Sequence, residues 1–137
     1  MLIVRDAKAG DATEVAALHV RAWQAAYRGL LAEQYLDTPR PEDRAARYAF
    51  GSSDTDVPQT ILAIEDGEIC GFASTGRCRD LDVPAAGELY ALYVDPPRWG
   101  TGVGRFLIAQ AYTRLRDLGA WQAVLWVLSA NERAERF

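Results

Sequence analysis

Histidine, cysteine and positive charge are scarce in this sequence, and each shortage removes a class of function. His19 is the only histidine, and the two cysteines, Cys70 and Cys78, do not have the spacing of a metal site. We therefore predict no metal centre and interpret both cysteines as reduced residues of a cytoplasmic protein. The chain has 15 basic and 19 acidic residues, a net charge of −4 and a pI near 5.0. This balance argues against general nucleic-acid binding and against an anionic membrane as a partner.

Long apolar runs are also absent, so the sequence predicts no membrane-spanning helix. The first residues, Met1 to Arg5, are typical of a short strand and not of a signal peptide. The chain has 137 residues, of which 50% are apolar and 25% charged. This is the size and composition of one globular domain, which we expect to cover residues 1–137.

Hydrophobic spacing predicts two helical regions in the first third of the chain. Asp11 and Glu14 have the spacing of a capping box, which predicts a helix from Asp11 to about Arg28. The inner face of this helix consists of Val15, Leu18 and Ala22. A second helical region covers residues 31–48 and is interrupted by Pro39 and Pro41, of which Pro41 suits the first position of a new helix.

Strands dominate the middle of the chain. Residues 60–65 and 69–77 are predicted strands, and Asp66-Gly67 between them is a strong hairpin signal. A further strand at 87–94, a helix from 103 to about 118 and an apolar strand at 123–128 follow. This order predicts an α/β fold with a mixed, mostly antiparallel sheet.

The segment from Asp95 to Arg105 contains three glycines in five residues, between a predicted strand and a predicted helix. The first N–H groups of a helix have no intrahelical partner, and glycine lets an anion approach the backbone closely. A phosphate-binding turn is the functional interpretation, and a plain tight turn is the structural one. Arg105 follows Gly104 where a P-loop requires lysine, and no carboxylate stands at the end of the next predicted strand, as a dinucleotide fold requires.

The run Leu92-Tyr93-Val94-Asp95-Pro96, followed by Trp99-Gly100-Thr101-Gly102-Val103-Gly104, a helix, an apolar strand and Asn131, resembles the GNAT superfamily of acyl-CoA-dependent N-acyltransferases. The family's loop reads Gln/Arg-x-x-Gly-x-Gly/Ala. Gly102 and Gly104 match it, and Trp99 stands at the Gln/Arg position. The resemblance implies a GNAT-like fold, with helices flanking the sheet, and acetyl-CoA as co-substrate.

The resemblance also implies where the cofactor binds. Leu92 and Val94 would pair with the pantetheine amides as a strand does, and a backbone N–H near Leu92 and Tyr93 would stabilise the oxyanion. The pyrophosphate would lie over the glycine turn. The full set of implied cofactor contacts is Leu92, Tyr93, Val94, Arg98, Gly100, Thr101, Gly102, Val103, Gly104, Arg105 and Asn131. Asn131 is equally suited to capping the helix that it begins.

Glu88 is the candidate general base, because it lies four residues before Leu92 and regular strand alternation would place both on one face. Tyr90 shares that face and would order a water or bind the acceptor. The structural alternatives are an exposed strand-end carboxylate and a packing tyrosine. Three aromatic residues of the N-terminal helices would line an acceptor pocket or pack in the core: Trp23, Tyr27 and Tyr35.

The sequence after Asn131 holds about two turns of a helix, whereas the family continues with a longer helix, a tyrosine acid and further strands. We therefore expect the domain to lack its C-terminal strands and the chain alone to be poorly soluble or to associate, for example as a homodimer. The predicted function is N-acetyl transfer from acetyl-CoA to a primary amine by direct attack. A non-catalytic acyl-CoA-binding module is the alternative. Antibiotics, polyamines, amino acids and protein N-termini all remain compatible as acceptors.

Overall fold

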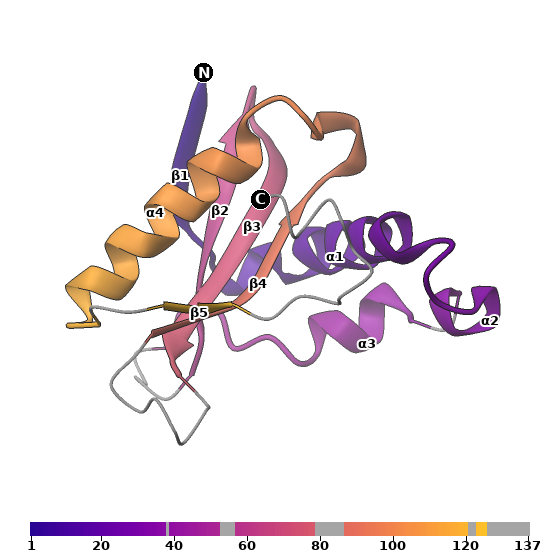
Figure 1. Cartoon of the computed structure of the whole chain (residues 1–137), viewed down its shortest axis with the longest axis horizontal. Helices are drawn as coiled ribbons and strands as arrows, with labels where there is room; N and C mark the ends of the chain where they lie inside the picture. The colour runs from indigo at the N-terminus through magenta and orange to yellow at the C-terminus, as the bar shows by residue number, and fades with distance from the viewer. Residues whose placement is uncertain (38, 53–56, 79–86, 121–122, 126–137) are drawn as a thin grey trace.

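The computed structural model describes residues 1–137 except 38, 53–56, 79–86, 121–122 and 126–137 (Figure 1). The described strands form one five-stranded sheet in the order β1-β2-β3-β4-β5. Their bounds are β1 (Leu2–Asp6), β2 (Gln59–Glu65), β3 (Glu68–Arg77), β4 (Gly87–Val94) and β5 (Ala123–Leu125). Strands β1 to β4 are antiparallel, and β5 is parallel to β4. The mixed, mostly antiparallel sheet predicted from the sequence is confirmed.

Helices cover both faces of this sheet, as Figure 1 shows. The helices are η1 (Ala9–Asp11), α1 (Ala12–Tyr27), α2 (Glu33–Leu36), α3 (Pro41–Ala45), η2 (Pro96–Arg98) and α4 (Val103–Asp117). One core lies between α4 and the sheet and includes Ala73, Leu89 and Leu107. The other lies between α1 and the sheet and includes Leu18, Leu62 and Phe72. We call these two sides the α4 face and the α1 face.

Local turn residues explain where the elements end. Asp66 and Gly67 both have positive φ, 54° and 79°, and form the predicted hairpin between β2 and β3. Pro41 begins α3, as expected. Gly29 and Gly119 have φ of 87° and 88° and follow the ends of α1 and α4.

The predicted capping role of Asp11 is wrong. Its side chain makes no cap bond to α1. Instead its carboxylate accepts the Lys8 N–H at 2.8 Å and a bidentate pair of hydrogen bonds from Arg5 at 2.8 and 2.9 Å. These bonds lower the pKa of Asp11 to about 2, with the Arg5 hydrogen bond as the largest cause. The guanidinium of Arg5, in β1, therefore outcompetes the N-terminus of α1 for the Asp11 carboxylate.

Within the described part of the chain, no helix combines the length and the apolarity needed to cross a membrane. The predictions for Asn131 and for the segment that follows it lie outside the described residues.

Candidate active site

Among the described residues, no strand pairs with the second half of β4 on the side away from β3, and we call this side the open edge. Among the described residues, β5 pairs only with the first three residues of β4. On the other side, the N–H of Asp95 donates to the carbonyl of Cys70 in β3 at 2.9 Å. Alternate residues of an antiparallel strand direct both backbone groups toward the partner. Leu92 and Val94 therefore direct their N–H and C=O groups toward the open edge, whereas Tyr93 directs its own toward β3.

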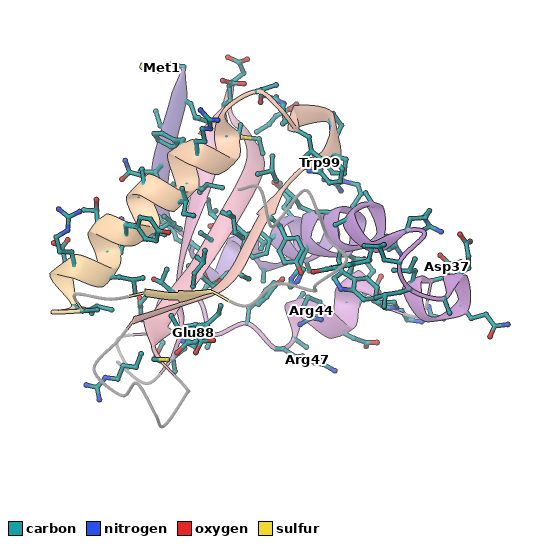
Figure 2. All side chains as sticks on the ribbon, in the orientation of Figure 1. Met1, Asp37, Arg44, Arg47, Glu88 and Trp99 are labelled. Carbon is teal, nitrogen blue, oxygen red and sulfur yellow. The ribbon has the colours of Figure 1, made fainter. Side chains whose placement is uncertain are left out.

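Trp99 forms a hydrogen bond with one of these edge-facing backbone groups, the carbonyl of Val94. Its indole Nε1–H donates to the carbonyl of Val94 at 2.8 Å, and its ring packs against the core on the α4 face. In Figure 2, Glu88 and Trp99 mark the two ends of the β4 region. Considering the described residues alone, the N–H of Val94 and both backbone groups of Leu92 remain to face the open edge. A strand-like ligand with amide groups could pair with them.

The glycine turn leads directly from this edge into α4. Gly100 and Gly102 have φ of 76° and 94°, and Gly102 is the N-cap of α4. The first helical bond runs from the N–H of Phe106 to the carbonyl of Gly102 at 3.0 Å. Helix geometry leaves the preceding N–H groups, those of Val103, Gly104 and Arg105, without intrahelical acceptors. The first turn of α4 contains no acidic residue, so an anion meets no opposing carboxylate there.

The side chains around this turn differ in their contacts: one packs in the core, one forms a hydrogen bond within the turn, and one is exposed to solvent. Val103 is buried and packs above Gly71 of β3, where an added Cβ would lie 3.2 Å from Val103 Cγ1 and 2.9 Å from Leu107 Cδ1. Its side chain is therefore part of the core, and only its backbone N–H faces the turn. The hydroxyl of Thr101 donates to the carbonyl of Arg98, which fixes the turn. The Arg105 side chain is exposed.

Arg98, predicted to contact the phosphates, is already bound by carboxylates in the described fold. Its guanidinium forms an ion pair with Glu65 at the end of β2 and lies 3.7 Å from the carboxylate of Glu68. Both partners belong to the β2–β3 hairpin, which adjoins the loop in the fold. The two carboxylates neutralise the guanidinium, so we leave Arg98 out of the cofactor site.

The loop is also tied to α1. Arg21 donates from Nε and Nη2 to the two oxygens of Asp95, each at 3.0 Å. A bidentate pair of this kind fixes both distance and orientation. The start of the loop is therefore held against the helix that covers the α1 face.

A β-bulge at Tyr90 overturns the expected orientation of Glu88. Ser74 pairs with Ala91 and Thr75 with Leu89, so Tyr90 is the extra residue of β4. Leu89 and Leu92 consequently both lie on the α4 face. Because neighbouring strand residues alternate, Glu88 faces α1, opposite to the Leu92 side chain. Glu88 is 1% exposed, so the solvent-facing alternative is wrong as well.

Tyr90 itself has a packing role in the described structure. An added Cβ at Gly76 would lie 2.8 Å from the Tyr90 ring, so the ring covers that glycine. The Tyr90 hydroxyl donates to the carbonyl of Arg77. These contacts join β4 to the end of β3 and support the structural interpretation of Tyr90.

An aromatic cluster on the α1 face surrounds the one histidine. The His19 ring centroid lies 4.5 Å from that of Tyr93 and 5.3 Å from that of Phe72. His19 Nδ1 is hydrogen-bonded to the Tyr48 hydroxyl at 2.8 Å. Burial and, to a smaller extent, the nearby Arg44 charge lower the pKa of His19 to about 4, so the ring is neutral at pH 7. Burial raises the pKa values of Tyr48 and Tyr93 to about 12.

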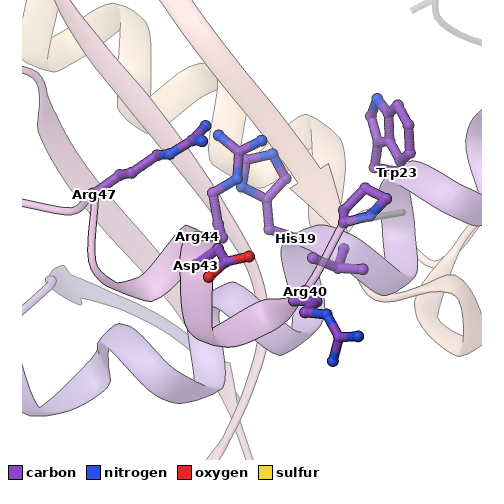
Figure 3. Close-up of a pocket in the computed structure, with 8 residues that line it drawn as sticks. His19, Trp23, Arg40, Asp43, Arg44 and Arg47 are labelled. Atoms are coloured by element: carbon purple, nitrogen blue, oxygen red, sulfur yellow. The ribbon is translucent and has the colours of Figure 1, made fainter. Parts of the chain in front are cut away.

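Beside this cluster is a cavity of about 330 Å³ between α1 and the α3 region. Its lining residues are His19, Val20, Trp23, Pro39, Arg40, Asp43, Arg44 and Arg47 (Figure 3). Trp23, for which the sequence left an acceptor pocket and core packing open, lines this cavity, and its role toward an acceptor stays a prediction. Tyr27 instead packs against Trp23, with ring centroids 6.0 Å apart. The side chain of Tyr35 lies outside the described part of the chain.

A sequence model of the Acetyltransferase (GNAT) family matches residues 13–137. The chain belongs to this family. Acetyl transfer is therefore its general activity, and the family resemblance noted in the sequence is confirmed.

Relatives and solved structures agree with this family. An uncharacterized N-acetyltransferase of Bacillus subtilis is 30% identical over 138 residues, which cover 96% of this chain and 74% of the relative. One from Mycobacterium tuberculosis is 34% identical over 132 residues, covering 93% of this chain and 79% of the relative. The PaiA N-acetyltransferase of Thermoplasma acidophilum, solved with coenzyme A, has the same fold: the TM-score is 0.80 at 18% identity, over 100% of this chain and 86% of that one.

The sequence analysis missed the charged wall of the cavity. Arg40, Arg44 and Arg47 recur at helical spacing, four and then three residues apart, so one face of a helix could have been predicted to carry all three. Their position opposite His19 depends on the packing of α3 on α1, which spacing alone does not indicate. The structure thus brings together a strand edge, a glycine turn and a basic cavity within one acetyltransferase domain.

Proposed function

We propose that the chain transfers the acetyl group of acetyl-CoA to the primary amine of a small molecule or peptide by direct attack. The observation that carries this proposal is the open edge of β4 beside the glycine turn. The edge offers amide-pairing groups at Leu92 and Val94, and the turn offers free N–H groups at the start of α4. A thioester with an amide-containing arm and a pyrophosphate has both complementary parts.

In this arrangement the pantetheine arm pairs with β4 as an added strand. The pyrophosphate lies at the N–H groups of Val103, Gly104 and Arg105. Gly100 and Gly102 give the turn its shape, and the Arg105 side chain adds positive charge. Tyr93 contributes no edge-facing backbone group, and its ring belongs to the α1 face.

The chemistry needs few groups. The neutral amine attacks the thioester carbonyl carbon, a C–N bond forms, and the resulting oxyanion needs a fixed donor. The edge-facing N–H of Leu92 is the proposed donor. The C–S bond then breaks, and the thiolate leaves with the electron pair. Because a thiol has a pKa near ~8.5, this departure needs little help from an acid.

Glu88 is the proposed base that accepts the amine proton, directly or through water. It faces the same side of the sheet as α1 and the cavity, although it is not among the residues that line the cavity. Tyr90 is assigned no catalytic part.

The test is acetyl-CoA-dependent release of thiol with a panel of primary amines, with the acetylated product identified by mass spectrometry. Turnover with at least one amine, and none with acetyl-CoA alone beyond slow hydrolysis, is the expected result. Calorimetric binding of acetyl-CoA without acetylation of any amine would favour a non-catalytic acyl-CoA-binding module. Absence of both binding and turnover would refute the proposal.

A further inference from the structure

The cavity beside α1 has a strongly uneven charge. Its described lining includes three guanidiniums, from Arg40, Arg44 and Arg47, and one carboxylate, from Asp43. Since the neighbouring His19 is neutral, these described residues carry a net charge of about +2 at pH 7. In Figure 3, Arg44 and Arg47 extend to the same side, and Arg40 points away from them.

These three arginines differ from Arg5 and Arg21 in their partners. Within the part of the chain that the structure describes, Arg40, Arg44 and Arg47 form no ion pair. By contrast, Arg5 is paired with Asp11 and Arg21 with Asp95. The charge that lines the cavity is therefore left without a carboxylate partner inside the described fold.

The charge of Arg44 acts on the aromatic cluster beside the cavity. It opposes protonation of His19 and favours ionisation of Tyr48 and Tyr93, although burial dominates the pKa of all three. Arg44 is half-buried beside these rings, so its charge is less screened than that of a fully exposed arginine. An anion in the cavity would receive a planar donor pair from this guanidinium.

The cavity lies next to the proposed acetyl-transfer edge. His19 lines the cavity and contacts the Tyr93 ring at a centroid distance of 4.5 Å. Tyr93 in turn stands between Leu92 and Val94, which face the open edge. The rings of His19 and Tyr93 thus lie between the basic cavity and the backbone of β4, along which the thioester is proposed to bind.

We infer that the acceptor is a small amine that also carries an anionic group, a carboxylate or a phosphate, bound by Arg44 and Arg47. This inference rests on the proposed function and narrows it. Polyamines and aminoglycosides carry only positive groups, which the cavity would repel. A cavity of about 330 Å³ suits a molecule of amino-acid size.

The test compares amines that differ only in the anion. The pairs are β-alanine with ethylamine, 4-aminobutyrate with propylamine, and O-phosphoethanolamine with ethanolamine, with spermidine as a cationic acceptor. We expect kcat/KM to be at least tenfold higher for the anionic member of a pair, and this preference to fall as salt is raised. The carboxylate and phosphate pairs show which anion is preferred.

Arg44→Gln and Arg47→Gln should each reduce the preference severalfold or more, by raising KM for the anionic amine. Arg116→Gln is the matched control, because it removes the same charge from an exposed position on α4. Arg47 is exposed, so its substitution leaves folding intact even if Arg44→Gln lowers the melting temperature.

Three results would overturn the inference. Equal kcat/KM within every pair, with turnover present, would refute it and leave the proposed function standing. A rise in KM for acetyl-CoA in place of the amine would show that the cavity binds a cofactor phosphate. No acetylation of any amine would refute the proposed function, and the inference with it.

Discussion

Replacing Gly104 by valine tests the proposed pyrophosphate site most directly. Gly104 is the second residue of α4 and is not among the glycines with positive φ. A side chain is therefore compatible with its backbone, and helix propensity changes by only a few tenths of a kcal/mol in favour of valine, roughly. Gly102 is a poorer choice, because at φ of 94° any Cβ costs about 1–2 kcal/mol on its own.

The expected loss follows from the three N–H groups at this turn. A hydrogen bond to a charged group contributes about 1.5–3 kcal/mol. If the branched side chain keeps the phosphates from two of the three groups, binding weakens by about 3 kcal/mol at the lower end of that range. This corresponds to a roughly hundredfold rise in Kd for acetyl-CoA. Gly104→Ala, with one methyl group, should show a smaller rise.

Calorimetric titration of acetyl-CoA measures this effect directly. Ala109→Val is the control, since Ala109 is an exposed residue of the same helix and lies beyond its first turn. Its Kd should equal that of the unsubstituted chain, and urea denaturation should show that all variants fold. An unchanged Kd for folded Gly104→Val would refute the assignment of the pyrophosphate to this turn.

Three further predictions concern other parts of the site. Glu88→Gln should lower kcat about hundredfold and flatten the acidic limb of the pH–rate profile while KM for acetyl-CoA is retained; a normal profile would reject the base role. Arg21→Gln removes the ion pair with Asp95 and should raise KM for acetyl-CoA severalfold, while the free energy of unfolding falls by only about 0.2–1 kcal/mol. An unchanged KM would show that this ion pair does not position the loop. Because the pKa of His19 is about 4 in the folded state and 6.5 when unfolded, the free energy of unfolding should fall as pH drops from 6.5 to 4, and His19→Gln should remove this part of the dependence in urea titrations.

The parts of the fold that the sequence predicted well are those set by neighbouring residues. The Asp66-Gly67 hairpin and the glycine turn before α4 follow from backbone conformations that few other residues adopt. The inner face of α1 follows from apolar spacing, and its predicted members are buried. In each case, the deciding interaction lies within a few positions of the residue concerned.

The contacts that the sequence did not predict involve distant residues or the pairing of two strands. Arg98 is paired with Glu65, which is 33 positions away, so the sequence around the turn does not reveal that its charge is neutralised. Asp11 is bound by Arg5 from the neighbouring strand, which competes with the helix N-terminus. The orientation of Glu88 depends on how β4 pairs with β3, because the bulge becomes visible only in the register of the two strands.

The bulge at Tyr90 also makes the pairing register of β4 decisive for the chemistry of the site. Counting by twos along a regular strand would put Glu88 and Leu92 together, and one inserted residue separates them onto opposite sides of the sheet. If β4 paired with β3 without the bulge, Tyr90 would lie opposite Thr75, and the Glu88 carboxylate would turn toward the apolar layer under α4. The register of two strands, with no change in the chemistry of any side chain, therefore decides on which side of the sheet this acid is presented.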